Sequence, residues 1–143
     1  MKANELRIGN KIYGNYQREI DRGNGIVEDI ECQDIVTFEG YDPIDNYFHI
    51  SDVKIYDSLE PIPLTEEWLL KFGFVWELDK SYSLTINENF GLFIWVDLNT
   101  LHPIAELIDS GDRVVVNHIE YIHELQNLYF ALTGEELKLL KDE

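Results

Sequence analysis

Apolar and polar residues alternate along much of the first half of the chain, and this period of two predicts β-strands. Residues 25–40 read GIVEDIECQDIVTFEG, with aliphatic residues and Cys32 on one parity. That parity continues on both sides of the polar pair Gln33-Asp34. We interpret the stretch as two antiparallel strands joined by a turn at this pair.

Shorter elements are expected around this stretch. Residues 6–14 predict a strand with a turn at Gly9-Asn10, and residues 15–25 predict a loop or a long hairpin. Residues 47–50 and 53–56 predict two further short strands.

In the second half, the spacing changes to that of helices at two places. PIPLTEEWLLKFG, residues 61–73, predicts a two-turn helix in which Thr65 is the N-cap and Gly73 the C′ residue. Residues 74–78, 82–86 and 90–98 predict strands, and the last is apolar on both faces, as in a central strand. Residues 102–108 predict a short helix or strand, and residues 113–117 another strand.

A closing helix is predicted from Ile122 by apolar residues at three-four spacing, with Gly134 just after its end. The residues expected to face inward are Leu125, Leu128, Tyr129 and Leu132, and those expected to face outward are Gln126 and Asn127.

The segments GNKI, GIVEDI and DIVTF, within the first 55 residues, resemble the opening strands of small SH3-like barrels, many of which bind RNA, DNA or protein. The expected fold class is therefore α+β: an N-terminal SH3-like β-barrel followed by an antiparallel sheet with two packed helices. The expected boundary separates residues 1–60 from 61–143, although one continuous domain is also compatible with the pattern.

Charge changes the functional picture. The chain has 28 acids against 11 Lys and Arg, a formal net charge of −17. Residues 1–23 hold five bases and three acids, a net of +2, so the other 120 residues carry −19. This field repels phosphate backbones and anionic lipids, which disfavours direct nucleic-acid or membrane binding and leaves a basic protein partner.

The acids concentrate at residues 24–60, where ten of them accompany Lys54 alone. Residues 40–48 add aromatic side chains to a turn-rich segment, and such aromatics can anchor a partner. The predicted partner-binding residues are Glu28, Asp29, Glu31, Asp34, Glu39, Tyr41, Asp42, Asp45 and Tyr47. The alternatives are a solvated face that keeps the protein soluble and a row of carboxylates that imitates nucleic-acid phosphates.

Catalytic motifs are not evident. His118 and His123 flank a predicted strand-to-helix junction near Glu120 and Glu124, which makes a metal site or a hydrolytic carboxylate/His site conceivable, but surface or capping histidines are the simpler interpretation. Cys32, the only cysteine, reads as a small buried hydrophobe. No catalytic residue, metal or cofactor is predicted, and a binding protein is favoured over an enzyme.

Three blocks, KANELRIGN, PIPLTEEWLLKFGF and HELQNLYFALTGEEL, resemble a family of uncharacterised small proteins from bacterial phages and mobile elements. The resemblance implies a cytoplasmic accessory protein that acts by binding host machinery, including immune nucleases, and it brings no catalytic residues. A cytoplasmic location also fits the single cysteine, the absence of an apolar stretch typical of a signal peptide, and the absence of a long apolar run.

Overall fold

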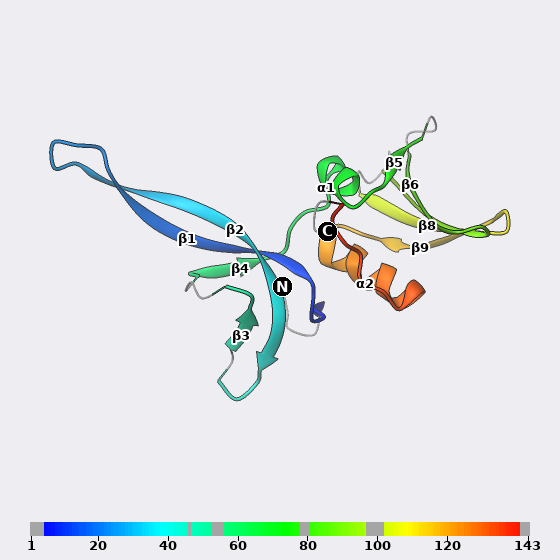
Figure 1. The fold of residues 1–143 in the computed structure, drawn as a ribbon, viewed down its shortest axis with the longest axis horizontal. Coiled ribbons are helices and arrows are strands. Elements are labelled where there is room, and N and C mark those ends of the chain that lie inside the picture. The colour runs from blue at the N-terminus through cyan, green and yellow to red at the C-terminus, as the bar shows by residue number, and fades with distance from the viewer. Residues whose placement is uncertain (1–4, 46, 53–55, 78–80, 97–101, 141–143) are drawn as a thin grey trace. The chain divides into compact units, whose positions relative to one another are not determined.

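The computed structural model describes residues 5–45, 47–52, 56–77, 81–96 and 102–140. The chain divides into two compact units, Met1–Ile62 and Pro63–Glu143, each built on its own antiparallel sheet (Figure 1). Both described helices belong to the second unit. The architecture is therefore α+β, as predicted.

The first unit is a four-stranded sheet in the order β3-β2-β1-β4. Its strands are β1 (Lys11–Asp21), β2 (Val27–Asp42), β3 (Tyr47–Ile50) and β4 (Ser58–Glu60). Among the described residues this sheet is open, because β3 and β4 lie at opposite edges and do not pair with each other. The expected SH3-like barrel is therefore not a closed barrel in this structure.

The predicted turn at Gln33-Asp34 is wrong, because β2 runs through it without a break. Gln33 lies opposite Asn15, and Asp34 lies opposite Gly14, so residues 15–21 also belong to a strand. The Gln33 amide donates to the side-chain oxygen of Asn15 at 2.9 Å. Polar side chains in mid-strand are thus satisfied by partners distant in the sequence.

The core of the first unit lies where the sheet is widest. Ile12, Val36 and Phe38 are buried there, and partly buried apolar residues of the neighbouring strands and loops pack against them. Burial of each such side chain contributes about 1.5–3 kcal/mol to folding. The predicted strand at residues 47–50 is confirmed as β3, whereas residues 53–55 of the other short strand lie outside the described residues.

The second unit is a five-stranded sheet in which each strand pairs with its neighbour in sequence. Its elements are α1 (Glu66–Lys71), β5 (Val75–Trp76), β6 (Ser81–Asn87), β7 (Phe90–Val96), β8 (Pro103–Asp109), β9 (Asp112–His118) and α2 (Ile122–Thr133). The central position of β7 is confirmed, and the ambiguous stretch at residues 102–108 is a strand. Residues 78, 97 and 98 of the predicted strands lie outside the described part.

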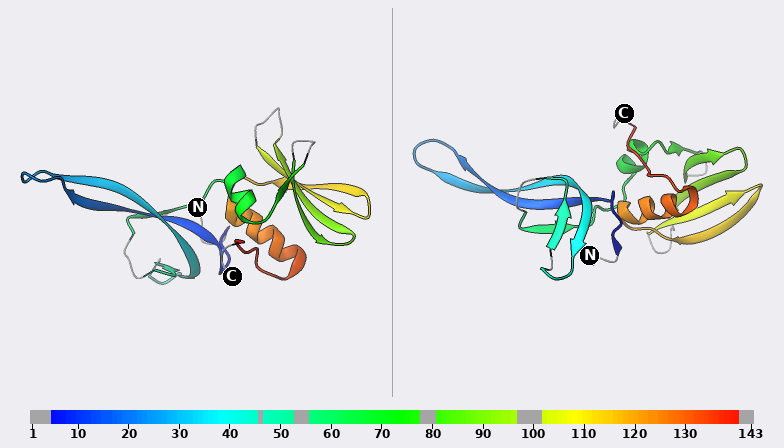
Figure 2. Two further views of the ribbon diagram at one scale, coloured as in Figure 1. Left: turned by 45° about the horizontal axis from the view of Figure 1, so that its top comes forward. Right: turned by 60° about the horizontal axis from the view of Figure 1, so that its bottom comes forward.

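Both helices begin and end where the capping signals predict. The Thr65 side chain accepts a hydrogen bond from the Trp68 N–H at 3.4 Å, and Gly73 and Gly134 adopt positive φ angles of 91° and 74°. In both views of Figure 2, α2 lies beside the sheet of its own unit. Leu125 is fully buried as expected.

One expectation about α2 is wrong. Gln126, predicted to face outward, is only 2 % exposed, and His123 is buried to the same degree. Leu128, Tyr129 and Leu132 are half-buried rather than fully buried. The buried stripe of α2 therefore includes the polar residues at its first two turns.

Candidate protein-binding surface

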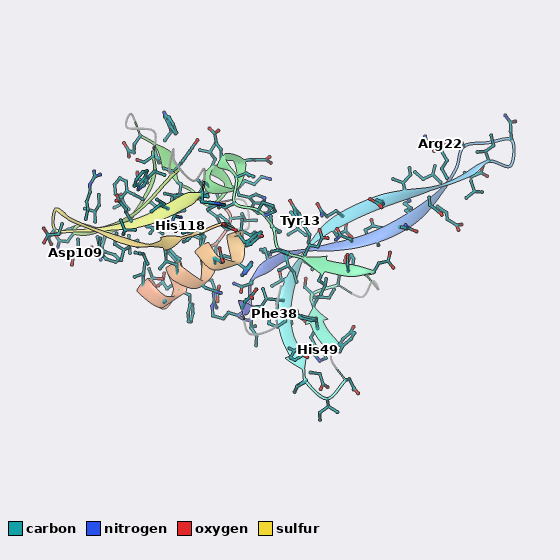
Figure 3. All side chains as sticks on the ribbon, turned by 180° about the vertical axis from the view of Figure 1, so that it is seen from behind. Tyr13, Arg22, Phe38, His49, Asp109 and His118 are labelled. Atoms are coloured by element: carbon teal, nitrogen blue, oxygen red, sulfur yellow. The ribbon has the colours of Figure 1, made fainter. Side chains whose placement is uncertain are left out.

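The most distinctive feature of the first unit is a long two-stranded ribbon. Pairing of β1 with β2 runs from Lys11–Thr37 to Asp21–Val27, whereas β4 pairs only with residues 13–15 and β3 only from residue 38 onward. Residues 16–32, which we call the arm, thus form a hairpin with which no third strand pairs among the described residues. Figure 3 shows Arg22 near the outer end of this arm, far from Phe38 in the core.

Strand alternation divides the arm into two faces. One face continues the side of the sheet that carries the core residues Ile12 and Val36, and it consists of Tyr16, Arg18, Ile20, Glu28, Ile30 and Cys32. We call it the core-side face. The opposite face consists of Gln17, Glu19, Asp21, Val27, Asp29 and Glu31.

That opposite face, called the acidic arm face below, concentrates negative charge. Glu19 lies directly opposite Asp29, and Asp21 and Glu31 lie one step away on either side. Like charges directly opposite each other destabilise a strand pair. The two arginines of the arm do not offset this charge, because Arg18 lies on the core-side face and Arg22 pairs with Glu28 at 3.1 Å. Glu19 and Asp21 were not predicted as site residues.

Four of the predicted partner-binding residues lie on the paired part of β2, and they divide between its two faces. Asp29 and Glu31 belong to the acidic arm face. Glu28 and Asp34 point to the core side, and the Asp34 carboxylate accepts a hydrogen bond from the Tyr56 hydroxyl at 3.0 Å. Asp34 therefore serves the packing of the unit.

Tyr56 is held by two carboxylates and by a glycine. Its hydroxyl also lies 2.8 Å from Asp52, and its ring lies directly over Gly14. Burial, together with the hydrogen bonds and charges of Asp52 and Asp34, raises the pKa of Tyr56 well above the usual value of a phenol. The neutral hydroxyl remains a donor throughout the physiological pH range.

The remaining predicted residues lie on the β2–β3 hairpin. Glu39 is the extra residue of a β-bulge, and Tyr41 packs its ring on Phe48 with centroids 5.1 Å apart. The side chain of Asp42 accepts hydrogen bonds from the backbone N–H groups of Ile44 and Asp45, at 2.9 and 3.3 Å, which shapes the turn. The structure thus assigns a local structural role to Tyr41 and Asp42.

Tyr47 and Ile44 are the most exposed large apolar side chains among the described residues of this hairpin, at 58 % and 91 %. The Tyr47 ring meets His49 edge-on, with centroids 5.2 Å apart. Figure 3 shows His49 on the β2–β3 hairpin, away from Arg22 at the end of the arm. The nine predicted residues are therefore spread over two faces of the β1–β2 ribbon and a second hairpin, and they do not form one continuous site.

An open groove of about 500 Å³ borders the acidic arm face at the point where β4 meets β1. Across its floor, the Asn15 side chain accepts a hydrogen bond from Gln33 at 2.9 Å and donates one to Ser58 at 3.0 Å. The groove is lined by Asn15, Tyr16, Gln17, Glu31, Cys32, Gln33, Asp57, Ser58 and Glu60. Cys32, expected to be a buried side chain, is half-buried at this groove.

His102, which lies against His118, meets Glu120, one of the carboxylates considered in the sequence. His102 approaches Glu120 at 2.9 Å and meets the His118 ring edge-on, whereas His123 stacks on Tyr121 inside the second unit. Glu124 accepts hydrogen bonds from the backbone N–H groups of residues 120 and 121 at the start of α2. Within the described residues, no group of three or more His, Cys, Asp or Glu could hold a metal ion.

The fold and this surface define a protein of two small antiparallel-sheet units, one of which carries an extended, two-faced β-ribbon. Comparisons with protein-family models, curated proteins and solved structures found no match. No helix in the described part of the chain is long and apolar enough to cross a membrane.

Proposed function

We propose that this chain is a non-enzymatic binding protein that engages a basic partner protein through the acidic arm face. The observation that carries the proposal is the unbalanced face itself, where Glu19 and Asp29 lie directly opposite each other on a ribbon without a third strand. Such a pair destabilises the ribbon. Cationic side chains of a partner would relieve that repulsion.

The adjacent groove supports the same partner chemistry. Glu31 belongs to both the acidic arm face and the groove wall, and Asp57 and Glu60 add two further carboxylates to that wall. Arginine suits such a site, because its planar guanidinium donates to carboxylate and amide oxygens at once. We therefore expect an arginine-bearing segment of the partner to lie along the arm and place one side chain in the groove.

A second form of the proposal is nucleic-acid mimicry. Carboxylates two residues apart on a strand are separated by about 6.5–7 Å, and the arm carries them on both strands. In this form the partner is a nucleic-acid-binding protein, for example a nuclease of a host defence system. Two resemblances remain hypotheses: that of the chain to phage and mobile-element proteins, and that of the first unit to SH3-like barrels. They suggest a search for the partner among bacterial host proteins.

An enzyme has less support. A hydrolase built on His118 or His123 requires a histidine and a carboxylate to converge on a pocket. Instead, His118 lies against His102, and His123 is buried within the second unit. The Glu124 carboxylate is engaged at the start of α2, and the Glu120 carboxylate lies 2.9 Å from His102.

The test compares two variants of equal charge. The arm variant Glu19→Gln/Asp29→Asn/Glu31→Gln and the control variant Glu88→Gln/Asp109→Asn/Glu135→Gln each change the formal net charge from −17 to −14. The three control residues are exposed acids of the second unit. Each protein is immobilised and exposed to a bacterial lysate at low and at high salt.

We expect a partner that binds the unmodified chain and the control variant, is lost from the arm variant, and binds less as salt rises. A partner that is retained equally by both variants, or no specific partner at either salt, would contradict the proposal. Release of the partner by a short DNA duplex would favour the mimic form, and retention would favour the simple binding form.

A further inference from the structure

The core-side face of the arm carries the apolar side chains Ile20 and Ile30, and among the described residues no third strand lies beside them. An isolated two-stranded ribbon is at most marginally stable in water, and a third strand or a packed layer is needed for independent stability. Ile20 and Ile30 are half-buried on this face, and Ile26 at the tip is 57 % exposed. Within the part of the chain that the structure describes, the arm therefore lacks a third strand that would help to cover these side chains.

The charges on this face differ from those on the acidic arm face. Arg18 lies opposite Ile30, Glu28 lies opposite Ile20, and Arg22 follows near the tip. The core-side face thus mixes both signs of charge around its isoleucines. A second copy of the chain can meet such a face without net repulsion, whereas two acidic arm faces would repel each other.

We propose that two copies of the chain pack their arms against each other, core-side face to core-side face, around a twofold axis. In the face of one arm, Arg18 and Glu28 occupy one diagonal of a four-residue square, and Ile20 and Ile30 occupy the other. When the twofold axis runs along this second diagonal, the two ribbons cross at a steep angle. Ile20 and Ile30 of one copy then each lie on the same residue of the other copy. The same crossing places Arg18 of each copy on Glu28 of the other.

This crossed packing resembles the orthogonal arrangement of two stacked sheets, and it forms a closed, isologous interface. Parallel or antiparallel stacking of the ribbons would instead place each charged residue on an isoleucine. The crossed arrangement is therefore the twofold packing in which apolar and charged positions both match. It leaves both acidic arm faces outward, so the dimer would present two copies of the surface proposed above for the partner.

The mass in solution provides the first test, measured by analytical ultracentrifugation over a wide range of concentrations. We expect twice the chain mass of 16.8 kDa at high concentration. The variant Ile20→Thr/Ile30→Thr keeps β-branched side chains but removes apolar contact, and we expect it to remain at the monomer mass. The control Val27→Thr/Ile35→Thr makes the same change at exposed residues of the opposite face, and we expect it to dimerise normally.

Charge reversal provides a second test that does not depend on the isoleucine variant keeping its fold. Arg18→Glu places two acids against each other in the crossed packing, and we expect it to give monomers. Arg18→Glu/Glu28→Arg restores the opposite signs, and we expect it to recover the dimer. Monomers of the unmodified chain at every concentration, loss of the dimer in the valine control, or failure of the double reversal to restore it would each overturn the proposal.

The two proposals are separable in the same experiments. The arm variant that neutralises Glu19, Asp29 and Glu31 changes only the outward face, and we expect it to dimerise like the unmodified chain. Its mass therefore reports on the crossed packing alone, whether or not any basic partner is found.

Discussion

Replacing Gly14 by alanine tests the close approach between β1 and Tyr56. A Cβ atom at Gly14 would lie 2.6 Å from Cδ1 of Tyr56 and 2.8 Å from Cε1 and Cγ, which is closer than carbon atoms pack. The ring would have to move, yet its hydroxyl is hydrogen-bonded to Asp34 and Asp52 at 3.0 and 2.8 Å. After the substitution, the Tyr56 ring cannot both avoid the new methyl group and keep its hydrogen bonds to Asp34 and Asp52.

The magnitude follows from three contributions. Overpacking of this kind costs about 1–3 kcal/mol, and loss of a hydrogen bond to a charged group costs about 1.5–3 kcal/mol. Alanine favours a strand over glycine by about 0.5–1 kcal/mol. The expected net loss of unfolding free energy for Gly14→Ala is therefore roughly 1.5–5.5 kcal/mol. When Tyr56 is first replaced by alanine, the same substitution is expected to be neutral or slightly stabilising.

The assay is a double-mutant cycle of Gly14→Ala and Tyr56→Ala in urea. All three tryptophans lie in the second unit, so unfolding of the first unit is followed by amide NMR signals of Ile12 and Val36. An equal cost of Gly14→Ala in the presence and absence of the Tyr56 ring would refute the reasoning, because the clash requires that ring.

Two further predictions concern the second unit. Leu125→Ala removes a fully buried side chain and is expected to cost about 2–5 kcal/mol, more than Leu128→Ala at a half-buried position; urea denaturation followed by tryptophan fluorescence checks this, and equal costs would contradict it. Burial, helped by the hydrogen bond and charge of Glu66, raises the pKa of Tyr82 from 10.0 to about 12. Because the folded state then binds the Tyr82 proton more tightly than the unfolded state does, Tyr82 stabilises the folded state. This stabilisation is fully present below pH 10 and is lost as the pH rises to about 12. Tyr82→Phe is expected to flatten that loss in urea midpoints measured across this range, and an unchanged slope would contradict it.

Local signals were sufficient for the elements whose ends depend on neighbouring residues. Thr65 and Gly73 marked the ends of α1 because an N-cap and a left-handed C′ residue act within a few residues of the chain. The apolar character of residues 92–96 likewise indicated the central strand β7, because both faces of such a strand are covered.

Signals that depend on distant partners misled the interpretation. Gln33 and Asp34 resemble turn residues, yet their side chains are satisfied by Asn15 and by the hydroxyl of Tyr56. A polar pair in mid-strand can be recognised only when the strands opposite it are known. The outward position expected for Gln126 is wrong, and the structure buries this side chain within the second unit.

The candidate site shows the same limit. Glu19 and Asp21 belong by sequence to residues 1–23, which carry a net charge of +2, but the hairpin brings them beside Asp29 and Glu31. Charge counted along the chain and charge gathered on a surface differ whenever two strands fold back on each other. The GNG sequence at residues 23–25 indicates a turn that folds β2 back on β1. Only the register of the two strands shows which acids then lie together.

The order of strands in the two sheets also has a consequence for how quickly each unit forms. In the second unit every strand pairs with its immediate neighbour in sequence, so the pairing within its sheet is local. In the first unit β4 must return across more than forty residues to pair Ser58 with Asn15. Since pairing slows as contacting residues lie further apart in sequence, the sheet of the second unit is expected to form before the complete sheet of the first unit in refolding. During synthesis the first unit leaves the ribosome before the second unit. It can therefore begin to fold earlier, in the opposite order to the one expected in refolding.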